Sequence, residues 1–175
     1  MAEDNGILSL TVRNPVSGYL YTNLSECFGN YFSGEVVDVD CYGCPSKQAN
    51  SLRSVAGTDP DVLLIHLKRF DNDGRKLGHP VEFQPYLPGK SDDRRYMLTG
   101  VVLHKGQSIL RGHYRSVIRC AKSGKLYLLD DHRPPMLIAD SDATLDVIYR
   151  QAYILVFSKE DKTVNEITNF VGQAR

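Results

Sequence analysis

The segment DVLLIHLKRF, residues 61–70, decides the fold of this chain. Its apolar run from Val62 to Ile65 is unbroken, as expected of a β-strand that is covered on both faces. His66 follows this run and is expected to be a core residue with a satisfied hydrogen bond. Lys68 and Arg69 are expected where the strand emerges into solvent. By itself, nothing in this segment demands catalysis.

Further strands are predicted on both sides of this segment. Upstream, Leu8, Leu10 and Val12 alternate with polar residues, which is the period of a half-buried strand. Other segments rich in β-forming residues also predict strands: 35–39, 96–104, 114–120, 125–129 and 152–157.

One helix is predicted near the N-terminus. Asn23, followed three residues later by Glu26, has the pattern of a capping box. The residues behind it have i, i+3, i+4, i+7 spacing and give the helix one apolar face: Leu24, Cys27, Phe28 and Tyr31. Few helices and many strands predict an α+β class with a largely antiparallel sheet.

Three connections between these elements can also be predicted. Residues 71–74 (DNDG) predict a turn, residues 122–124 (KSG) predict the tight turn of a hairpin, and the charged stretch 89–95 predicts an exposed loop. We expect one domain over residues 1–160 and a polar tail that frays over residues 161–175.

Composition excludes some classes of partner and compartment. The 21 basic and 21 acidic residues balance, so bulk charge favours neither a nucleic-acid nor a membrane-surface partner. The acidic start, MAEDNG, lacks the features of a secretory signal, and no apolar run is long enough to cross a bilayer. We therefore expect an intracellular protein, in the cytoplasm or nucleus, whose four cysteines are reduced thiols or metal ligands.

The candidate catalytic residues lie at the open end of the hairpin predicted from 114–120 and 125–129. His113 precedes one arm and Asp130 follows the other. A two-residue turn would not place them directly opposite each other, but a slightly longer loop or a bulge would. A carboxylate behind a histidine fixes the ring tautomer and stabilises the imidazolium, as an acyl-transfer enzyme requires. Gly112, without a Cβ, would let a substrate backbone approach closely.

A simpler interpretation is open on spacing alone. His113 could be a surface residue at a strand end, and Asp130 and Asp131 could form a solvated turn. Cys41 and Cys44, in CYGC, offer half of a tetrahedral zinc site, a redox pair, or an orphan pair in a turn. Spacing favours the orphan pair.

The order of these motifs resembles the ubiquitin-specific protease family. The blocks that carry the resemblance are LLIHLKRF at 63–70, VLHKGQS at 102–108, GHY at 112–114, YLLDD at 127–131 and AYIL at 152–155. The interval of seventeen positions from His113 to Asp130 (130 minus 113) also resembles the family spacing. The similarity extends from about Leu8 to about Ser158, and five ordered blocks make it specific.

The resemblance implies a papain-like fold, of which this chain is the C-terminal half: the palm and part of the fingers. His113 is then the catalytic base, Asp130 the residue that orients it, and Asp131 a helper. Loops 107–112 and 71–78 correspond to two blocking loops beside the ubiquitin tail. Substrate contacts are implied for Gly112, Tyr114 and Ser108.

The departures from the family are equally informative. The family nucleophile lies in an Asn-rich box near the start of the catalytic domain, and no such box exists here. Cys27, on the apolar helix face, is expected to be a core residue. The first CxxC of the zinc-bearing fingers is also absent, so Cys41 and Cys44 bind zinc only if a second pair comes from outside the chain. Otherwise no cofactor is required.

A base without its nucleophile cannot form an acyl-enzyme, so this chain alone is predicted to be inactive. The leading hypothesis is a thiol-dependent deubiquitinase represented by its C-terminal half, with ubiquitin or a ubiquitinated protein as partner. The chain is then a fragment from an incomplete gene model, a truncated isoform, or one part of a split domain whose N-terminal half another chain supplies. The alternative is a non-catalytic ubiquitin-binding module. A weaker third option is a small zinc or redox protein that uses Cys41 and Cys44.

Overall fold

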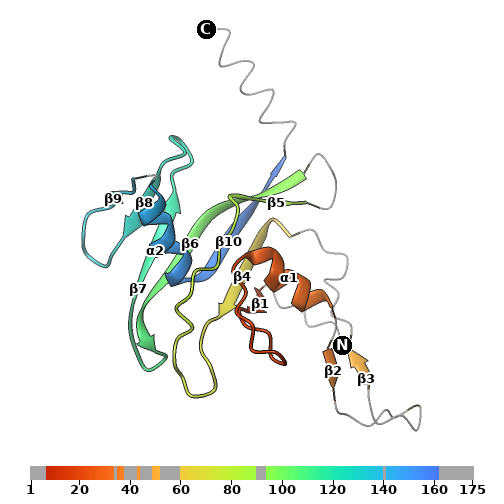
Figure 1. The fold of residues 1–175 in the computed structure, drawn as a ribbon. Coiled ribbons are helices and arrows are strands. Elements are labelled where there is room, and N and C mark those ends of the chain that lie inside the picture. Colours follow the sequence, from red (N-terminus) through yellow and green to blue (C-terminus); the bar gives the residue numbers. More distant parts are fainter. Residues whose placement is uncertain are drawn as a thin grey trace.

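The computed structural model describes residues 7–33, 35–37, 43, 49–51, 60–89, 94–139 and 141–161. An eight-stranded sheet dominates this part of the chain, with strand order β1-β4-β10-β6-β7-β8-β9 and β5 paired to β6 (Figure 1). Two short strands form a separate pair, β2 (Glu35–Val37) with β3 (Ala49–Ser51). The elements of the large sheet and the helices are β1 (Ile7–Thr11), α1 (Leu24–Phe32), β4 (Val62–Lys68), β5 (Tyr86–Pro88), β6 (Arg94–Ser108), β7 (Arg111–Arg119), β8 (Leu126–Leu129), β9 (Met136–Leu137), α2 (Asp142–Gln151) and β10 (Ala152–Asp161).

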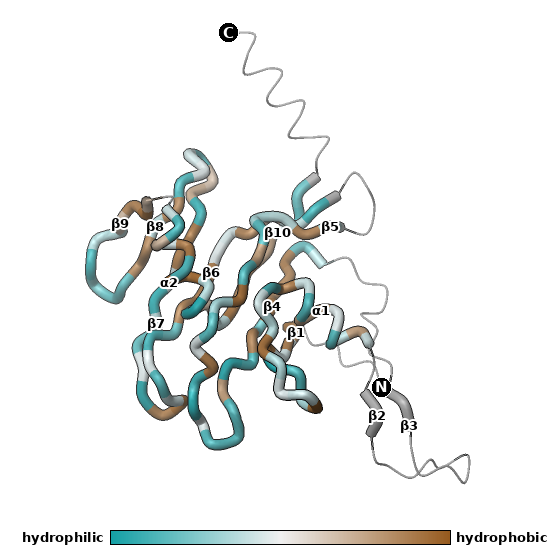
Figure 2. Tube along the Cα trace, viewed as in Figure 1, coloured by the Kyte–Doolittle hydropathy of each residue, from teal (hydrophilic) through white to brown (hydrophobic). Residues whose placement is uncertain are grey.

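The predicted fold class is confirmed. Among the described residues, every strand pairing is antiparallel except that of β1 with β4. The buried faces of α1 and α2 share one core with the sheet, through residues such as Cys27, Ile148, Ile65 and Leu155. Apolar stretches gather along the middle strands β4, β10 and β6 (Figure 2).

The segment that decided the fold forms β4, but it is fully covered on only one face. Ile65 and Leu67 are completely buried, whereas Leu64 and His66, which alternate with them, are only partly buried. The prediction of two covered faces was therefore wrong. The hydrogen bond expected for His66 is present, since its Nδ1 lies 3.3 Å from the hydroxyl of Ser9 on β1.

Arg69 is the clearest departure from expectation, because it is fully buried rather than exposed. Its Nε donates to the carbonyl of Ala152 at 2.5 Å, and its Nη1 donates to the carbonyls of Leu77 and His79 at 3.0 and 2.9 Å. Nη2 donates to the carbonyl of Tyr149. Burial lowers the Arg69 pKa to about 10. One guanidinium thus joins the end of β4 to the α2–β10 junction.

Helix α1 confirms the predicted start and the predicted apolar face. The Asn23 side chain accepts a hydrogen bond from the Glu26 amide at 3.0 Å, as an N-cap should. Glu26 bonds the amide of Thr22 at 2.7 Å, one residue before the cap. Leu24 and Cys27 are buried in the core, so this face anchors the helix on the sheet beside β1.

Other predictions were incomplete. Four predicted strands correspond to β6, β7, β8 and β10, and the predicted strand at 35–39 corresponds to β2. β6 begins at Arg94, so the predicted loop 89–95 was wrong at its last two residues, and residues 90–93 lie outside the described part. Helix α2 and the short strands β3, β5 and β9 were not predicted.

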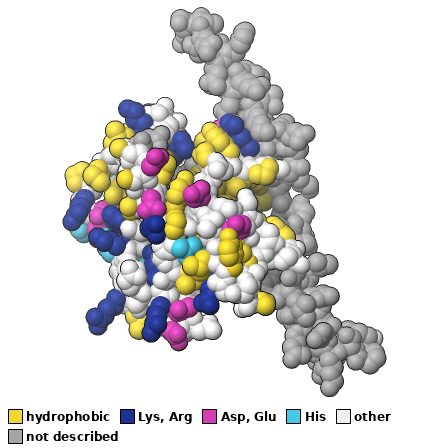
Figure 3. Space-filling model, viewed as in Figure 1, with side chains coloured by type: hydrophobic (Ala, Val, Ile, Leu, Met, Phe, Trp, Pro, Cys, Tyr) yellow, Lys and Arg dark blue, Asp and Glu magenta, His cyan; other side chains and the backbone are white. Residues whose placement is uncertain are grey.

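Several predictions fall outside the described residues: those for Cys41, Cys44 and nearly all of the tail 161–175. Of the helices in the described part, neither is long and apolar enough to cross a membrane. The surface in Figure 3 mixes acidic, basic and apolar side chains, in keeping with the balanced charge of the sequence.

Candidate active site

The candidate site begins with His113, the third residue of β7. His113 pairs with Lys105 of β6, and its side chain is 44% exposed. β7 then runs to Arg119 and returns as β8, which ends at Leu129 directly before Asp130. The two arms of one hairpin therefore deliver both residues to the same end of the sheet.

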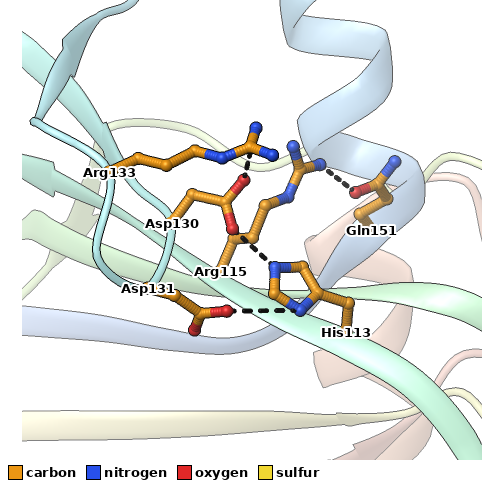
Figure 4. Close-up of polar contacts among 6 residues, drawn as sticks. All are labelled: His113, Arg115, Asp130, Asp131, Arg133 and Gln151. Atoms are coloured by element: carbon orange, nitrogen blue, oxygen red, sulfur yellow. Dashed lines mark hydrogen bonds and ion pairs between the residues drawn. The ribbon is translucent and has the colours of Figure 1, made fainter.

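The structure brings His113 and Asp130 together: His113 Nε2 lies 2.5 Å from Asp130 Oδ1 (Figure 4). The hairpin loop is longer than two residues, since the amide of Cys120 donates to the carbonyl of Lys125 at 2.8 Å across it. The resulting register does not place the pair directly opposite, as a longer loop was predicted to do. Ser116 pairs with Leu129, so Asp130 follows on toward Arg115, and His113 reaches it diagonally.

The position of the proton follows from this contact. An ionised carboxylate can only accept hydrogen bonds, so Nε2 of His113 must donate to Asp130. In the neutral ring this leaves the lone pair on Nδ1. The nearest acidic group to Nδ1 is Asp131, whose Oδ2 lies 3.9 Å away and whose side chain is 68% exposed. Nδ1 is thus the atom that can accept a proton from another group.

Asp130 is held in its charged form. The hydrogen bond from His113 is the largest cause that lowers the Asp130 pKa, and the positive charges of Arg133 and Arg115 add to it against the effect of burial. Arg133 Nη1 lies 3.7 Å from Asp130 Oδ2. A carboxylate that stays ionised is the form that can orient an imidazole.

Arg115 is a site residue that the sequence analysis missed. Its Nη2 donates to Oε1 of Gln151 at 2.8 Å, which connects β7 to the last residue of α2 (Figure 4). Its Nε is buried and has no partner among the described residues. No local pattern could have revealed this contact, because it depends on a helix that was not predicted.

The reason for a glycine at position 112 differs from the expectation. A Cβ built on Gly112 would lie 1.9 Å from Nε2 of His104, which is 1% exposed. The space beside Gly112 is therefore filled by a ring of the protein itself. The expected approach of a substrate backbone is not needed to explain this residue.

The two predicted blocking loops contact each other. The predicted loop 107–112 is a tight hairpin in which Ser108 pairs with Arg111, and Ile109 and Leu110 form its exposed tip. The Ile109 amide donates to the carbonyl of Gly74 at 3.0 Å, and Ser108 forms a bridge with Arg75.

Tyr114 is exposed beside this hairpin. Its side chain is 51% exposed, and its ring centroid lies 4.9 Å from that of His104 and 6.0 Å from that of Tyr153. Tyr114 follows His113 on β7, so the two side chains point to opposite faces of the sheet.

Neither cysteine in the described part can serve His113. Cys27 is fully buried, and burial raises its pKa to about 12. Cys120 lies seven positions beyond His113 along the strand direction, roughly 23 Å at the rise of an extended chain. A hydrogen bond from Ser123 lowers the Cys120 pKa, but distance excludes it. Cys41 and Cys44 lie outside the described residues.

Donor atoms of His113, Asp130 and Asp131 all lie within 4.8 Å of one another, a spacing that could hold a metal ion. A metal at Nε2 would have to replace the hydrogen bond to Asp130, because one ring nitrogen cannot serve both. The arrangement therefore fits an acid–base pair without further change.

A large apolar hollow of about 540 Å³ lies elsewhere, between α2 and strands β6–β8. Its walls include Leu98, Val117, Leu126 and Ile148, and none of the candidate catalytic residues contributes to them. The candidate site is instead an open surface at the end of a hairpin.

Comparison with known proteins identifies relatives of this chain. A family model described as ubiquitin carboxyl-terminal hydrolase matches residues 22–157. Ubiquitin carboxyl-terminal hydrolase 23 of Arabidopsis thaliana is 31% identical over 151 residues, covering 79% of this chain and 17% of that protein. Ubiquitin carboxyl-terminal hydrolase 48 of Danio rerio is 30% identical over 127 residues, covering 63% of this chain and 12% of that protein.

A third relative differs in its name. The human inactive ubiquitin carboxyl-terminal hydrolase 17-like protein 7 is 30% identical over 130 residues, covering 70% of this chain and 23% of that protein. This chain spans less than a quarter of the length of each of these three relatives. The family match nevertheless covers most of the chain, including the hairpin with His113 and Asp130. The chain belongs to the ubiquitin carboxyl-terminal hydrolase family, as a member of the ubiquitin-specific protease type.

Proposed function

We propose that this chain carries the general base and the orienting acid of a cysteine-type deubiquitinase. His113 is the base, Asp130 orients it, and Asp131 assists from the turn. The observation that carries the proposal is the 2.5 Å contact between His113 Nε2 and Asp130 Oδ1. This contact leaves Nδ1 free to exchange protons on a ring that is 44% exposed.

In the complete enzyme, Nδ1 of His113 takes the proton of a cysteine thiol supplied from outside this chain. The thiolate attacks the isopeptide carbonyl of the C-terminal glycine of ubiquitin. The C–N bond breaks as Nδ1 returns the proton to the departing lysine amine, which leaves a thioester. Nδ1 then takes a proton from water, and the hydroxide attacks the thioester carbonyl. The C–S bond breaks, which releases the ubiquitin carboxyl group, and Nδ1 returns its proton to the departing sulfur.

We also propose that the chain is inactive alone. Cys27 is buried and Cys120 is remote, so neither supplies the required sulfur. Loss of the nucleophile from such a group of residues costs on the order of 10⁶ in kcat, by analogy with serine proteases. The exposed Tyr114, together with Gly112 and Ser108, lies beside the ubiquitin tail in this proposal.

Two experiments test these proposals. The chain is first treated with ubiquitin that bears a C-terminal electrophile, and we expect no covalent adduct. An adduct that mass spectrometry maps to Cys27, Cys41, Cys44 or Cys120 would contradict inactivity.

The second experiment supplies a nucleophile by fusing the N-terminal half of a relative's catalytic domain before Met1. We expect this chimera to cleave a fluorogenic ubiquitin substrate and to lose that activity on His113→Gln. An active chimera that keeps its activity after this substitution would exclude His113 as the base.

A non-catalytic ubiquitin-binding module is the second candidate function. It is favoured by the similarity to a human relative whose name describes it as inactive. The retained His113–Asp130 pair favours the enzyme, because a pure binder has no need of a base and its orienting acid. Titration of ¹⁵N-labelled ubiquitin with the chain measures binding. If His113→Gln removes the activity of the chimera without weakening this binding, the two functions are separate.

A further inference from the structure

A second histidine, His104, is completely enclosed beneath the candidate site. It lies on β6 opposite Tyr114 of β7 and is 1% exposed. Its ring centroid lies 5.3 Å from that of Phe70, 4.9 Å from that of Tyr114 and 6.3 Å from that of Tyr153. Aromatic rings thus surround the imidazole on the face of the sheet opposite to His113.

The remaining side of the ring is closed by two glycines of the β6–β7 hairpin. A Cβ on Gly112 would lie 1.9 Å from His104 Nε2 and 2.6 Å from Cε1. A Cβ on Gly106 would lie 3.1 Å from the same Cε1 and 2.9 Å from the Cα of Gly112. The ring therefore packs directly against the backbone of this hairpin, with no room for a side chain between them.

The backbone of His104 is also fixed. Its carbonyl accepts a hydrogen bond from Nζ of Lys76, whose pKa is lowered to about 8, chiefly by burial. Lys76 belongs to the 71–78 segment, and its backbone amide donates to the carbonyl of Gln107 at 2.9 Å. His104 Nδ1 is buried without a partner among the described residues, so packing rather than hydrogen bonding at this atom holds the ring.

We propose that His104 is a positioning residue, whose imidazole sets the path of the backbone at Gly112 and thereby places His113 within bonding distance of Asp130. Gly112 is covalently joined to His113, so a shift of its backbone moves the neighbouring imidazole. Such a shift would weaken the hydrogen bond between His113 Nε2 and Asp130 Oδ1, which are 2.5 Å apart. A displacement of about 1 Å would bring the two atoms out of the hydrogen-bonding range. This inference rests on the function proposed for His113 and Asp130.

The test uses the whole chain and needs no catalytic activity. Side-chain ¹⁵N NMR of histidine-labelled protein reports the tautomer of His113 and the Nε2–H proton held by Asp130. Carbon-13 NMR reports the Asp130 pKa. In the unaltered chain we expect the Nε2–H tautomer, and Asp130→Asn assigns its signal.

Gly112→Ala should push the His104 ring and the hairpin apart. We expect it to abolish the Nε2–H signal and to raise the Asp130 pKa, because the bond that lowers this pKa is lost. His104→Ala removes the ring that sets this backbone path, so it should also weaken or abolish the Nε2–H signal. Gly100→Ala is the matched control on β6, because a Cβ there meets its neighbours at ordinary distances of 3.6–3.8 Å.

The outcomes separate the role of His104 from the function proposed for His113 and Asp130. A folded Gly112→Ala or His104→Ala variant that keeps the signal would overturn the role of His104 alone. If Gly112→Ala does not fold, His104→Ala decides: loss of the signal in a folded variant supports the role, and its retention overturns it. Absence of the Nε2–H signal in the unaltered chain would overturn the base–acid pair itself.

Discussion

The register of the β7–β8 hairpin places Asp130 opposite Arg115, but its side chain bonds diagonally to His113. The carboxylate therefore lies between an imidazole that it orients and a cation that helps to keep it ionised. Gln151 at the end of α2 holds that cation at 2.8 Å. The pair thus depends on three elements, β7, β8 and α2, although its two residues come from one hairpin.

Asp130→Asn should reduce kcat by up to about 10⁴ in a chimera that carries a nucleophile. The amide can present a donor to His113 and favour the wrong tautomer, as in the corresponding change in serine proteases. Asp131→Asn, at the residue with the assisting role, should reduce kcat less, because Asp131 lies 3.9 Å from Nδ1, and asparagine tolerates its positive φ of 49°. Initial rates on a fluorogenic ubiquitin substrate measure both. A larger loss for Asp131→Asn would reverse the two roles.

Stability should depend on Asp130 at acid pH. The hydrogen bond from His113 lowers the pKa of this carboxyl below its unfolded value, which is about 3.9. The contribution of Asp130 is therefore fully present above about pH 4 and is lost as the pH falls through the folded pKa. Urea unfolding at a series of pH values from neutral to acid should show a smaller acid-dependent loss in Asp130→Asn. Parallel curves for the two proteins would contradict the lowered pKa.

Arg69→Met should destabilise the chain by about 3 kcal/mol or more, because it removes four hydrogen bonds to backbone carbonyl oxygens, of which the bond to Ala152 is buried. Lys68→Met, one residue earlier on the exposed end of β4, should change stability by no more than about 0.5 kcal/mol. Denaturant unfolding followed by circular dichroism compares the two. Equal effects would mean that the buried guanidinium contributes no more than an exposed lysine.

The two cysteines in the described part should differ in reactivity. At pH 8 we expect iodoacetamide to alkylate Cys120 in the folded chain, because hydrogen bonding lowers its pKa and it is partly exposed. Cys27, with a pKa raised to about 12 in the core, should react only after unfolding. Mass spectrometry of timed samples measures each rate. Rapid labelling of Cys27 in the folded chain would show that α1 opens locally.

Local periodicity predicted the strands that pack in the core and the buried face of α1. In these segments the apolar positions of the sequence are also the buried positions. Helix α2 was missed since its signal is weak: Ile148 is its one buried residue, while Val147 is 43% exposed. Arg69 was misjudged because a basic residue after a strand gives no local sign that the chain turns inward.

The candidate site was predictable in its residues more than in its geometry. Motif order identified His113 and Asp130, but their diagonal contact depends on the hairpin register, which the sequence does not specify locally. The contact of His104 with Gly112 was hidden for the same reason, since it joins residues on two strands. Long-range contacts of this kind follow from the completed sheet.

β6 is bonded to β10 over residues 94–103 and to β7 over residues 100–105, so residues 100–103 are bonded to both strands. Amide hydrogens in such a central strand exchange with deuterium mainly through global opening, whereas those at the Ile109–Leu110 tip can exchange through local fluctuation. Residues 100–103 are thus among the slowest parts of the molecule to open, whereas His113 pairs with Lys105 nearer the tip, where β6 is not paired with β10. Exchange should therefore quicken from Gly100 toward the Ile109–Leu110 tip, and the imidazole of His113 is attached between the two.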